Sequence, residues 1–337
     1  MSYATAIRNI TLRFVRTKKN ITLRFVRTKN ITLRFVGTKK NITLRFVRTK
    51  NITLRFVRSK EQDFGARRPY YLRLQPWKPV PERAVPAEGV WCVLCRWRGA
   101  AFEGHPHSEW GTCPRCGSVG RDRMLHLSLI QRVPHRRRLR VIENSPRLNE
   151  KYRRAMRRRA DYITSDYDER AHKGTIKLNL EKMDLPDDWL DILLTAHVLE
   201  HVPDTEAALS EIYRVLRPGG HMLLQVPLHQ AVTAPPTEPE FHKDHTPVFW
   251  RFGLDLTERL RSHGFVTELL VTEELARRVA ARDVDWGGPL FPEVDATALV
   301  LHADPADLTV VASDALAERA WLQPCYMFAV WHCVKPR

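Results

Sequence analysis

The chain has 337 residues, enough for more than one folded core, and 43% of them are hydrophobic. No run reaches the roughly 18 uncharged apolar residues of a membrane-spanning helix, and the N-terminus lacks a secretory pattern, so we expect a cytoplasmic protein. The net charge of +17 is confined to residues 1–60, which hold 17 Lys and Arg and no acidic residue. Residues 61–337 hold 38 basic and 38 acidic residues, and this neutral balance argues against a dedicated nucleic-acid enzyme.

Residues 1–60 form a leader of near-identical copies of NITLRFVRTK, which begin at Asn9, Asn20, Asn30, Asn41 and Asn51. Two copies make one period of 21 residues. Apolar residues alternate with Thr and Arg, which is typical of strands, so a small β-solenoid or meander is one interpretation. We favour a leader that is disordered or an artefact of an expanded DNA repeat, because no capping unit is present and nothing balances the charge. A basic arm that binds nucleic acid or anionic membranes is the alternative.

Residues 61–88, rich in Pro and Arg, are predicted to be a linker, and residues 89–130 a zinc ribbon. The ribbon's predicted ligands have the arrangement C-x2-C-x17-C-x2-C and are Cys92, Cys95, Cys113 and Cys116. Two residues between cysteines let both thiolates bind one ion, and four thiolates close a tetrahedral site, so the predicted role of zinc is structural. We interpret His105 and His107 as surface loop histidines. Cys325 and Cys333 are interpreted as buried core thiols.

From residue 139 onward, short apolar runs alternate with helical stretches, as in a doubly wound α/β sheet. Strands are predicted at 139–144, 161–166, 175–180, 189–197 and 221–227, and helices at 146–159 and 204–216. Asp204 is well placed to cap the second helix. Ligands of such a sheet bind at the carboxyl ends of its strands, so we expect the functional site there.

The run HVLEHVPDTEAALSEIYRVLRPGGHMLLQVP, residues 197–227, closely resembles the type 11 branch of the class I S-adenosylmethionine-dependent methyltransferases. The resemblance implies a methyltransferase domain over residues 135–337, with a seven-stranded Rossmann-like sheet. Residues 249–265 resemble the helix and turn before strand six, and residues 324–335 would supply an antiparallel seventh strand. Together with the preceding CPxCGSxxRxR ribbon, the chain is similar to a bacterial group of zinc-ribbon methyltransferases.

The resemblance also implies S-adenosylmethionine as the cofactor, with contacts at the strand ends. The implied contacts are Glu143, Ser145, Asp166, Tyr167, Asn179, Leu180, Thr195, Ala196 and His197. Asp166 matches the ribose-binding acid of the family, residues 179–180 fall where it contacts the adenine, and residues 195–197 lie where the sulfonium should sit. Glu143 aligns with the acid that precedes a glycine-rich loop in related enzymes, but the loop of this chain contains no glycine.

His197 and His201 are the candidate catalytic residues, because histidines at positions i and i+4 can move protons or bind a metal. The alternative is that this run only shapes the pocket. The histidines after the fifth predicted strand, with one aspartate, are interpreted as part of a solvated loop; they are His229, His242, Asp244 and His245.

The predicted function is methyl transfer to an oxygen, nitrogen or carbon atom of a small metabolite or glycan precursor. An RNA methyltransferase is the first alternative, in which the ribbon and the basic runs at 135–140 and 151–159 grip the substrate. The second is a non-catalytic binding module whose cofactor loop has decayed.

Overall fold

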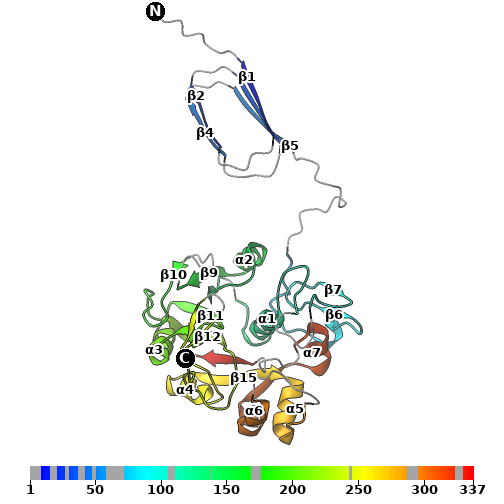
Figure 1. Cartoon of the computed structure of the whole chain (residues 1–337), viewed down its shortest axis with the longest axis vertical. Coiled ribbons are helices and arrows are strands. Elements are labelled where there is room, and N and C mark those ends of the chain that lie inside the picture. Colours follow the sequence, from blue (N-terminus) through cyan, green and yellow to red (C-terminus); the bar gives the residue numbers. More distant parts are fainter. Residues whose placement is uncertain are drawn as a thin grey trace, which may run out of the picture. The chain divides into compact units, whose positions relative to one another are not determined.

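The structure is a computed structural model that falls into two compact units, Met1–Tyr70 and Tyr71–Arg337 (Figure 1). In the first unit the structure describes the backbone of five strands. In the second it describes residues 72–104, 111–136, 138–167, 176–242, 245–286, 295–322 and 329–337. Four residues singled out in the sequence lie outside the described residues, namely His105, His107, Asp244 and Cys325.

Each copy of the leader repeat forms one strand of the first unit. The strands are β1 (Asn9–Val15), β2 (Ile21–Val26), β3 (Asn30–Val36), β4 (Ile42–Val47) and β5 (Asn51–Val57). Copies one full period apart pair in parallel, with Asn9 opposite Asn30 and Asn30 opposite Asn51. β2 pairs with β4 in the same way, so odd and even copies form separate sheets. Parallel pairing of copies 21 residues apart is the strand pairing that a small β-solenoid would have.

The second unit begins with a packed segment, a hairpin and a helix. A 3-10 turn (Glu82–Ala84) precedes the antiparallel strands β6 (Val90–Trp91) and β7 (Arg98–Gly99), and α1 (Gly120–Arg132) follows them. In the segment before the hairpin, Leu72, Leu74 and Trp77 are at most 8% exposed, and the N–H of Gln75 donates to the carbonyl of Leu94 (2.9 Å). Leu72, Leu74 and Trp77, which lie within the stretch 61–88 that was predicted to be a linker, therefore belong to a hydrophobic core.

A sheet of eight strands runs through the second unit in the order β10-β9-β8-β11-β12-β17-β15-β16. Its strands are β8 (Arg140–Asn144), β9 (Asp161–Asp166), β10 (Ile176–Lys177), β11 (Leu190–Ala196), β12 (Leu216–Gln225), β15 (Val266–Thr272), β16 (Leu308–Ala312) and β17 (Val330–Val334). All neighbours are parallel except β17, which runs antiparallel to β12 and β15. The predicted doubly wound sheet is confirmed with its antiparallel strand, and β16 adds an eighth strand at one edge.

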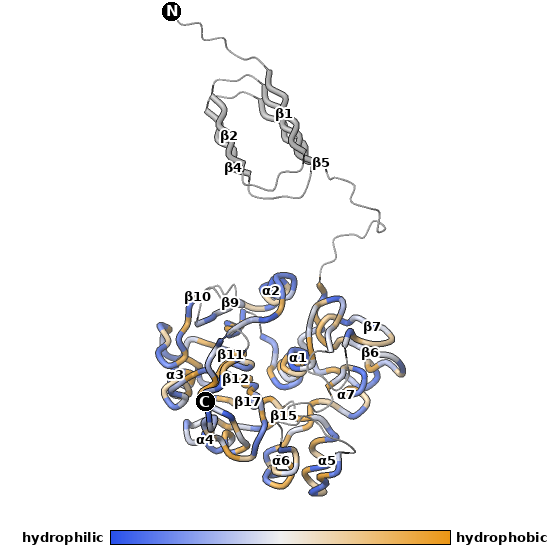
Figure 2. Tube along the Cα trace, viewed as in Figure 1, coloured by the Kyte–Doolittle hydropathy of each residue, from blue (hydrophilic) through white to orange (hydrophobic). Residues whose placement is uncertain are grey.

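Successive residues of the strands point to opposite faces of the sheet and enter two separate cores. Val141 and Ile142 are neighbours in β8, and each belongs to a different core. Figure 2 shows the resulting hydrophobic stretches along the central strands and a hydrophilic α2. One core includes the buried residues of the ribbon, α1, α2 (Glu150–Arg157) and α7 (Asp314–Ala320). The other includes those of α3 (Thr205–Val215), α4 (Leu256–Ser262), α5 (Glu273–Ala281) and α6 (Ala296–His302). The ribbon therefore shares its core with one face of the sheet.

Local hydrogen bonds define where the helices next to the site begin and end. Asn149 Oδ1 accepts the N–H of Lys151 (3.0 Å) at the start of α2, and Asp204 Oδ1 caps α3, as predicted. α3 passes directly into β12, which begins at Leu216, five residues earlier than expected. A short antiparallel pair, β13 (Glu240–Phe241) and β14 (Pro247–Val248), follows. Among the described residues, no helix has both the length and the hydropathy to cross a bilayer.

Deletion of residues 1–60 is expected to leave the unfolding temperature of the rest of the chain unchanged, because the second unit contains both hydrophobic cores. Binding to heparin should weaken, since the deletion removes 17 cations. Differential scanning calorimetry and heparin affinity of the full and shortened chains check this. A drop of several degrees on deletion would contradict the prediction.

Candidate metal centre and candidate active site

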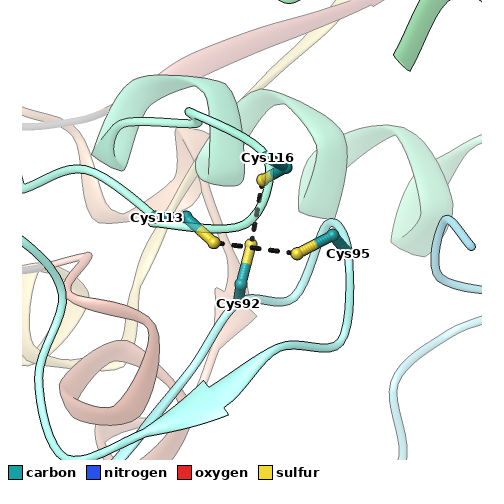
Figure 3. Close-up of side chains that lie close together, drawn as sticks. All are labelled: Cys92, Cys95, Cys113 and Cys116. Atoms are coloured by element: carbon teal, nitrogen blue, oxygen red, sulfur yellow. Dashed lines mark hydrogen bonds between the residues drawn. The ribbon is translucent and has the colours of Figure 1, made fainter. Parts of the chain in front are cut away.

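The four predicted metal ligands converge on one point (Figure 3). Their Sγ atoms all lie within 4.8 Å of one another, with 3.6 Å between Cys92 and Cys116 and 3.7 Å between Cys95 and Cys113. A tetrahedron with Zn–S bonds of about 2.3 Å has edges of about 3.8 Å, so the cluster has the size of a zinc site. All four thiols are buried, and none forms a disulfide. This donor set fits a structural zinc ion and leaves no open coordination position.

The two cysteine pairs lie in knuckles of the same backbone design. The carbonyl of Cys92 accepts the N–H of Arg96 (2.7 Å), and the carbonyl of Cys113 accepts the N–H of Gly117 (2.8 Å). Both donors have left-handed backbone, with φ of 62° at Arg96 and 76° at Gly117. Glycine adopts this conformation freely, whereas arginine does so at a cost of roughly 1–2 kcal/mol. The first knuckle therefore holds an exposed arginine at a strained position beside the metal centre.

A buried guanidinium joins the segment that carries the sulfurs to α7. Arg123 of α1 has no exposed surface, and its Nε donates to the carbonyl of Ala320 in α7 (2.7 Å). Its Nη1 donates to the carbonyls of Gly111 (2.9 Å) and Ser118 (2.7 Å), and its guanidinium lies 4.2 Å from the ring centre of Phe102. Four thiolates around Zn²⁺ carry a net charge of about −2, which the guanidinium partly offsets in this low-dielectric setting.

The carboxyl ends of β8, β11 and β12 carry a row of buried polar side chains. Asn144 ends β8 opposite Thr195 of β11, and Gln225 ends β12 opposite Ala196. Asn144, Thr195 and Gln225 are at most 6% exposed. Asn144 Nδ2, Thr195 Oγ1 and both amide atoms of Gln225 have no hydrogen-bond partner among the described residues. A buried polar atom without a partner costs about 1–3 kcal/mol, so the row fits a polar ligand. It lies where the strand order reverses and the crevice of a doubly wound sheet opens.

Glu143 lies next to this row but is engaged by the neighbouring strand. The hydroxyl of Tyr162 in β9 donates to Glu143 Oε2. Burial raises the pKa of Glu143 to about 7, against the effect of that hydrogen bond. The carboxyl therefore titrates near neutral pH.

The predicted ribose and adenine contacts lie at the ends of β9 and β10. Asp166 is half-buried at the last position of β9, and Tyr167 beside it is 67% exposed, with the Lys177 ammonium 5.7 Å from its ring centre. Asn179 is half-buried, whereas the side chain of Leu180 is buried in the core beneath the edge. Leu180 thus offers a ligand its backbone rather than its side chain.

The loop after β8 makes a left-handed turn without glycine. Ser145 has φ of 45°, and its N–H donates to the carbonyl of Ser165 (2.8 Å). Ser165 in turn donates from Oγ to Asn144 Oδ1 (2.5 Å), which orients the amide of Asn144. The loop therefore adopts at Ser145 a conformation that glycine would adopt at lower cost.

A second polar group surrounds the 3-10 turn Leu199–His201. Glu200 is 2% exposed, and its carboxylate lies 3.8 Å from His197 Nδ1 and 3.8 Å from His201 Nε2. Burial raises the pKa of Glu200 to about 8 and holds the pKa of His197 well below its usual value. At neutral pH, a protonated Glu200 therefore faces a neutral His197.

His201 Nδ1 lies 2.6 Å from the carbonyl of Pro247, so it carries the proton and leaves Nε2 as an acceptor. The ring of His242 packs against that of His201, with 4.7 Å between centroids. His242 and His245 are exposed, which agrees with the solvated loop that was expected. Within the described ranges, these histidines form no group that could hold a metal ion; the four cysteines do.

Neither Asn144 nor Gln225 is among the contacts predicted from the sequence, and Glu200 has no predicted role of its own. Asn144 and Gln225 are the polar residues that end the apolar runs VIEN and LLQ. A polar residue at the carboxyl end of a buried parallel strand was the available signal, because that end lines the crevice. The thiol prediction for Cys333 is confirmed, since this residue is fully buried.

Residues 138–224 match the family model described as a methyltransferase domain, which spans most of β8 to β12. A protein of Mycolicibacterium smegmatis named "Probable S-adenosylmethionine-dependent methyltransferase" is 33% identical over 113 residues, 34% of this chain and 43% of that protein. A ubiquinone/menaquinone biosynthesis C-methyltransferase of Vibrio vulnificus is 39% identical over 49 residues, 14% of this chain and 19% of that protein. The chain thus matches less than half the length of either relative.

Among solved structures, an S-adenosylmethionine-dependent methyltransferase from Mesorhizobium loti is similar at 18% identity and a TM-score of 0.34, covering 60% of this chain and 93% of that one. Phosphoethanolamine N-methyltransferase 2 of Haemonchus contortus, in complex with S-adenosyl-L-methionine, has 16% identity and a TM-score of 0.32. That similarity covers 61% of this chain and 50% of the other. The fold assignment rests on the strand order described above.

The purified protein is expected to contain about one zinc ion per chain, because the four thiolates complete one tetrahedral site. Cys113→Ser should lose the metal and expose the amides of residues 90–118 to hydrogen exchange. Cys333→Ser changes a buried cysteine outside the cluster and should retain zinc. Inductively coupled plasma mass spectrometry and hydrogen exchange measure both effects. Wild-type protein that folds without bound metal would refute the assignment.

The contribution of Glu143 to the free energy of unfolding should fall as the pH rises from about 4.5 to about 7. The folded-state pKa of this carboxyl is raised to about 7, so the folded chain binds more protons than the unfolded chain within that window. The difference between the folded and unfolded pKa values of Glu143 corresponds to up to ~3 kcal/mol, at about 1.4 kcal/mol per pKa unit. Glu143→Gln should remove this part of the decline in unfolding free energy. Urea unfolding of the variant and wild type at pH 5 and pH 8 tests it. An unchanged pH dependence in the variant would contradict the raised pKa.

Proposed function

We propose that this chain transfers a methyl group from S-adenosylmethionine to a nucleophilic oxygen, nitrogen or carbon atom. The observation that carries the proposal is the row of buried polar atoms on Asn144, Thr195 and Gln225 that lack partners among the described residues. Asn144 and Thr195 lie inside the segment that matches a methyltransferase domain, and Gln225 directly follows it. A ligand with amine, carboxylate and hydroxyl groups would satisfy these atoms at the crevice where a doubly wound sheet binds ligands.

The residues at this edge fit the parts of the cofactor. In the proposal, Asp166 accepts the ribose hydroxyls, with Tyr167 beside it, and residues 179–180 border the adenine. Ser145 and the row of amides and hydroxyl border the methionine part, with residues 195–197 beside the reacting centre. When bound, S-adenosylmethionine supplies an activated methyl group, so positioning of the acceptor accounts for most of the acceleration.

In the proposal, the cluster of Glu200, His197 and His201 holds or moves protons beside the reacting centre. Because its pKa is raised to about 8, the Glu200 carboxyl carries a proton at neutral pH and can donate a hydrogen bond. His201 Nε2, which lies 3.8 Å from the Glu200 carboxyl, can take a proton from a methyl acceptor that must lose one. His201 is thus our candidate general base, and His197 borders the pocket.

The neutral balance of residues 61–337 supports a small metabolite or glycan precursor as the methyl acceptor. An RNA acceptor is the second candidate. One specific observation favours it, namely a groove lined by arginines that have no carboxylate partner in the described part of the chain.

We further propose that zinc is structural, and that residues 89–130 form a ribbon attached to a methyltransferase domain over 135–337. The buried sulfur cluster supports the first part, since a closed site leaves no position for a substrate. The shared hydrophobic core supports the attachment of the ribbon to the sheet.

Asp166→Ala should weaken binding of S-adenosylmethionine by roughly ten- to a hundred-fold, because a charged hydrogen bond contributes about 1.5–3 kcal/mol. Asp161→Ala is the matched control, since Asp161 is exposed at the opposite end of the same strand. Isothermal titration calorimetry with the cofactor and with S-adenosylhomocysteine measures the affinities. If the wild-type protein binds neither compound at millimolar concentration, the proposal of an enzyme fails and the non-catalytic binding module takes its place.

A further inference from the structure

A basic groove of about 700 Å³ lies in the second unit, away from the carboxyl edge of the sheet. Its cationic lining comes from three segments that are distant in sequence, and consists of Arg73, Lys78, Arg96, Arg158 and Arg159. Its apolar floor includes Leu72, Leu74 and Trp77. Among the residues that the structure describes, no acidic side chain lines it.

The five cations of the groove have no carboxylate partner among the described residues. Arginines elsewhere in the unit are commonly paired, as in Arg132 with Glu268 (2.6 Å), and the guanidinium of Arg261 reaches Asp307 (2.5 Å). The near-zero net charge of residues 61–337 therefore conceals an uneven distribution. The folded chain uses many of its carboxylates in such pairs and leaves this groove positive.

Hydrogen bonds to the packed segment hold the groove arginines at its rim. Arg159 Nη2 donates to the carbonyl of Leu74 (2.9 Å), and Arg96 Nε donates to Gln75 Oε1 (2.6 Å). Burial, and then the nearby charges of Arg96 and Arg158, lower the pKa of Arg159. Like charges held this close are unfavourable without an anion between them.

A separate pocket of about 210 Å³ is lined by Arg136, Arg217, Lys335 and Arg337, among other residues. Two of these cations are paired, Arg217 with Asp191 and Lys335 with Asp188 (2.7 Å). The cations without a carboxylate partner among the described residues therefore gather in the first groove.

The groove lies at the amino edge of the sheet. Arg158 and Arg159 directly follow α2, which returns the chain from the carboxyl end of β8 to the start of β9 at Asp161. The five residues of β8 alone separate the two edges by about 16 Å. A small acceptor bound at the row of Asn144 and Thr195 does not reach the groove.

We propose that the groove binds a single-stranded nucleic acid through its phosphates, with the guanidinium forks of Arg73, Arg96, Arg158 and Arg159 as the principal contacts. Arginine forks match phosphate oxygens, and an apolar floor beneath a cationic rim suits a base-bearing chain better than a flat anionic membrane. Five cations in one groove of about 700 Å³ exceed what a single phosphate requires, which favours a chain of phosphates over a free nucleotide. This proposal does not rest on methyl transfer.

The test uses the full chain. Its binding to a 12-nucleotide oligouridylate or oligothymidylate with a fluorescent label at one end is measured by fluorescence anisotropy. Arg73 and Lys78 are exposed and have no carboxylate partner among the residues described, so Arg73→Glu with Lys78→Glu should weaken binding by roughly tenfold or more at 50 mM salt. The slope of log affinity against log salt should fall by roughly two. Lys151→Glu with Arg154→Glu is the matched control, since both residues are exposed on α2 outside the groove, and it should change affinity less than twofold.

Hydrogen exchange locates the contact independently of the basic leader. Bound oligonucleotide should protect residues 72–78 and 155–159 in the wild type and not in the groove variant. Equal affinity for both oligomers indicates recognition of the phosphodiester chain, and a preference for uridylate indicates RNA; either supports the proposal.

Several results would overturn it. Equal losses of affinity in the groove and control variants, or no hydrogen-exchange protection of the groove residues, would show that binding depends on overall positive charge and not on the groove. Full protection by uridine monophosphate or inorganic phosphate alone would indicate a site for a free nucleotide or ion. Tighter binding of polyglutamate, or of phosphatidylglycerol vesicles, through the same residues would identify another class of ligand.

Discussion

The buried guanidinium of Arg123 joins the ribbon to α7, a helix that shares its core with one face of the sheet. It donates to the backbone of the ribbon segment at Gly111 and Ser118, and to the backbone of α7 at Ala320. A hydrogen bond to a charged group contributes about 1.5–3 kcal/mol, and a buried polar group left without its partner costs further stability. A positive charge at this position also offsets the negative charge of four thiolates around a zinc ion. The ribbon is therefore held to the rest of the second unit by these hydrogen bonds as well as by the shared hydrophobic core.

This attachment explains how a small ribbon can form a binding surface with the rest of the unit. The knuckle places Arg96 at the rim of a groove whose other walls are the packed segment 72–78 and the end of α2. The shared core keeps these three parts in a constant relation, so arginines that are far apart in sequence present one positive surface. A ribbon joined by a free linker would not hold Arg96 next to Arg159.

The two edges of the sheet differ in the polar groups that they present to a ligand. At the carboxyl edge these are neutral amides and a hydroxyl on Asn144, Thr195 and Gln225, together with carboxyls whose pKa values burial raises toward neutrality. At the amino edge they are cations. Unpartnered buried polar groups lower stability, and such groups concentrate where a protein binds a ligand. The carboxyl edge suits a neutral or zwitterionic cofactor, and the amino edge suits a polyanion.

The sequence by itself determined the features that depend on local order. Apolar runs predicted β8, β9 and β11 to within a residue or two, Asp204 marked the start of α3, and the spacing of the cysteines identified the sulfur cluster, because each pattern reflects neighbouring backbone geometry. The tertiary structure decided the added strand β16, the packing of residues 72–77 and the burial of Gln225. It also decided which arginines remain unpaired. Arg132 pairs with Glu268, which lies 136 residues further along the chain, whereas Arg73 has no carboxylate partner among the described residues. Composition alone cannot separate these two cases, because ion pairing depends on long-range folding.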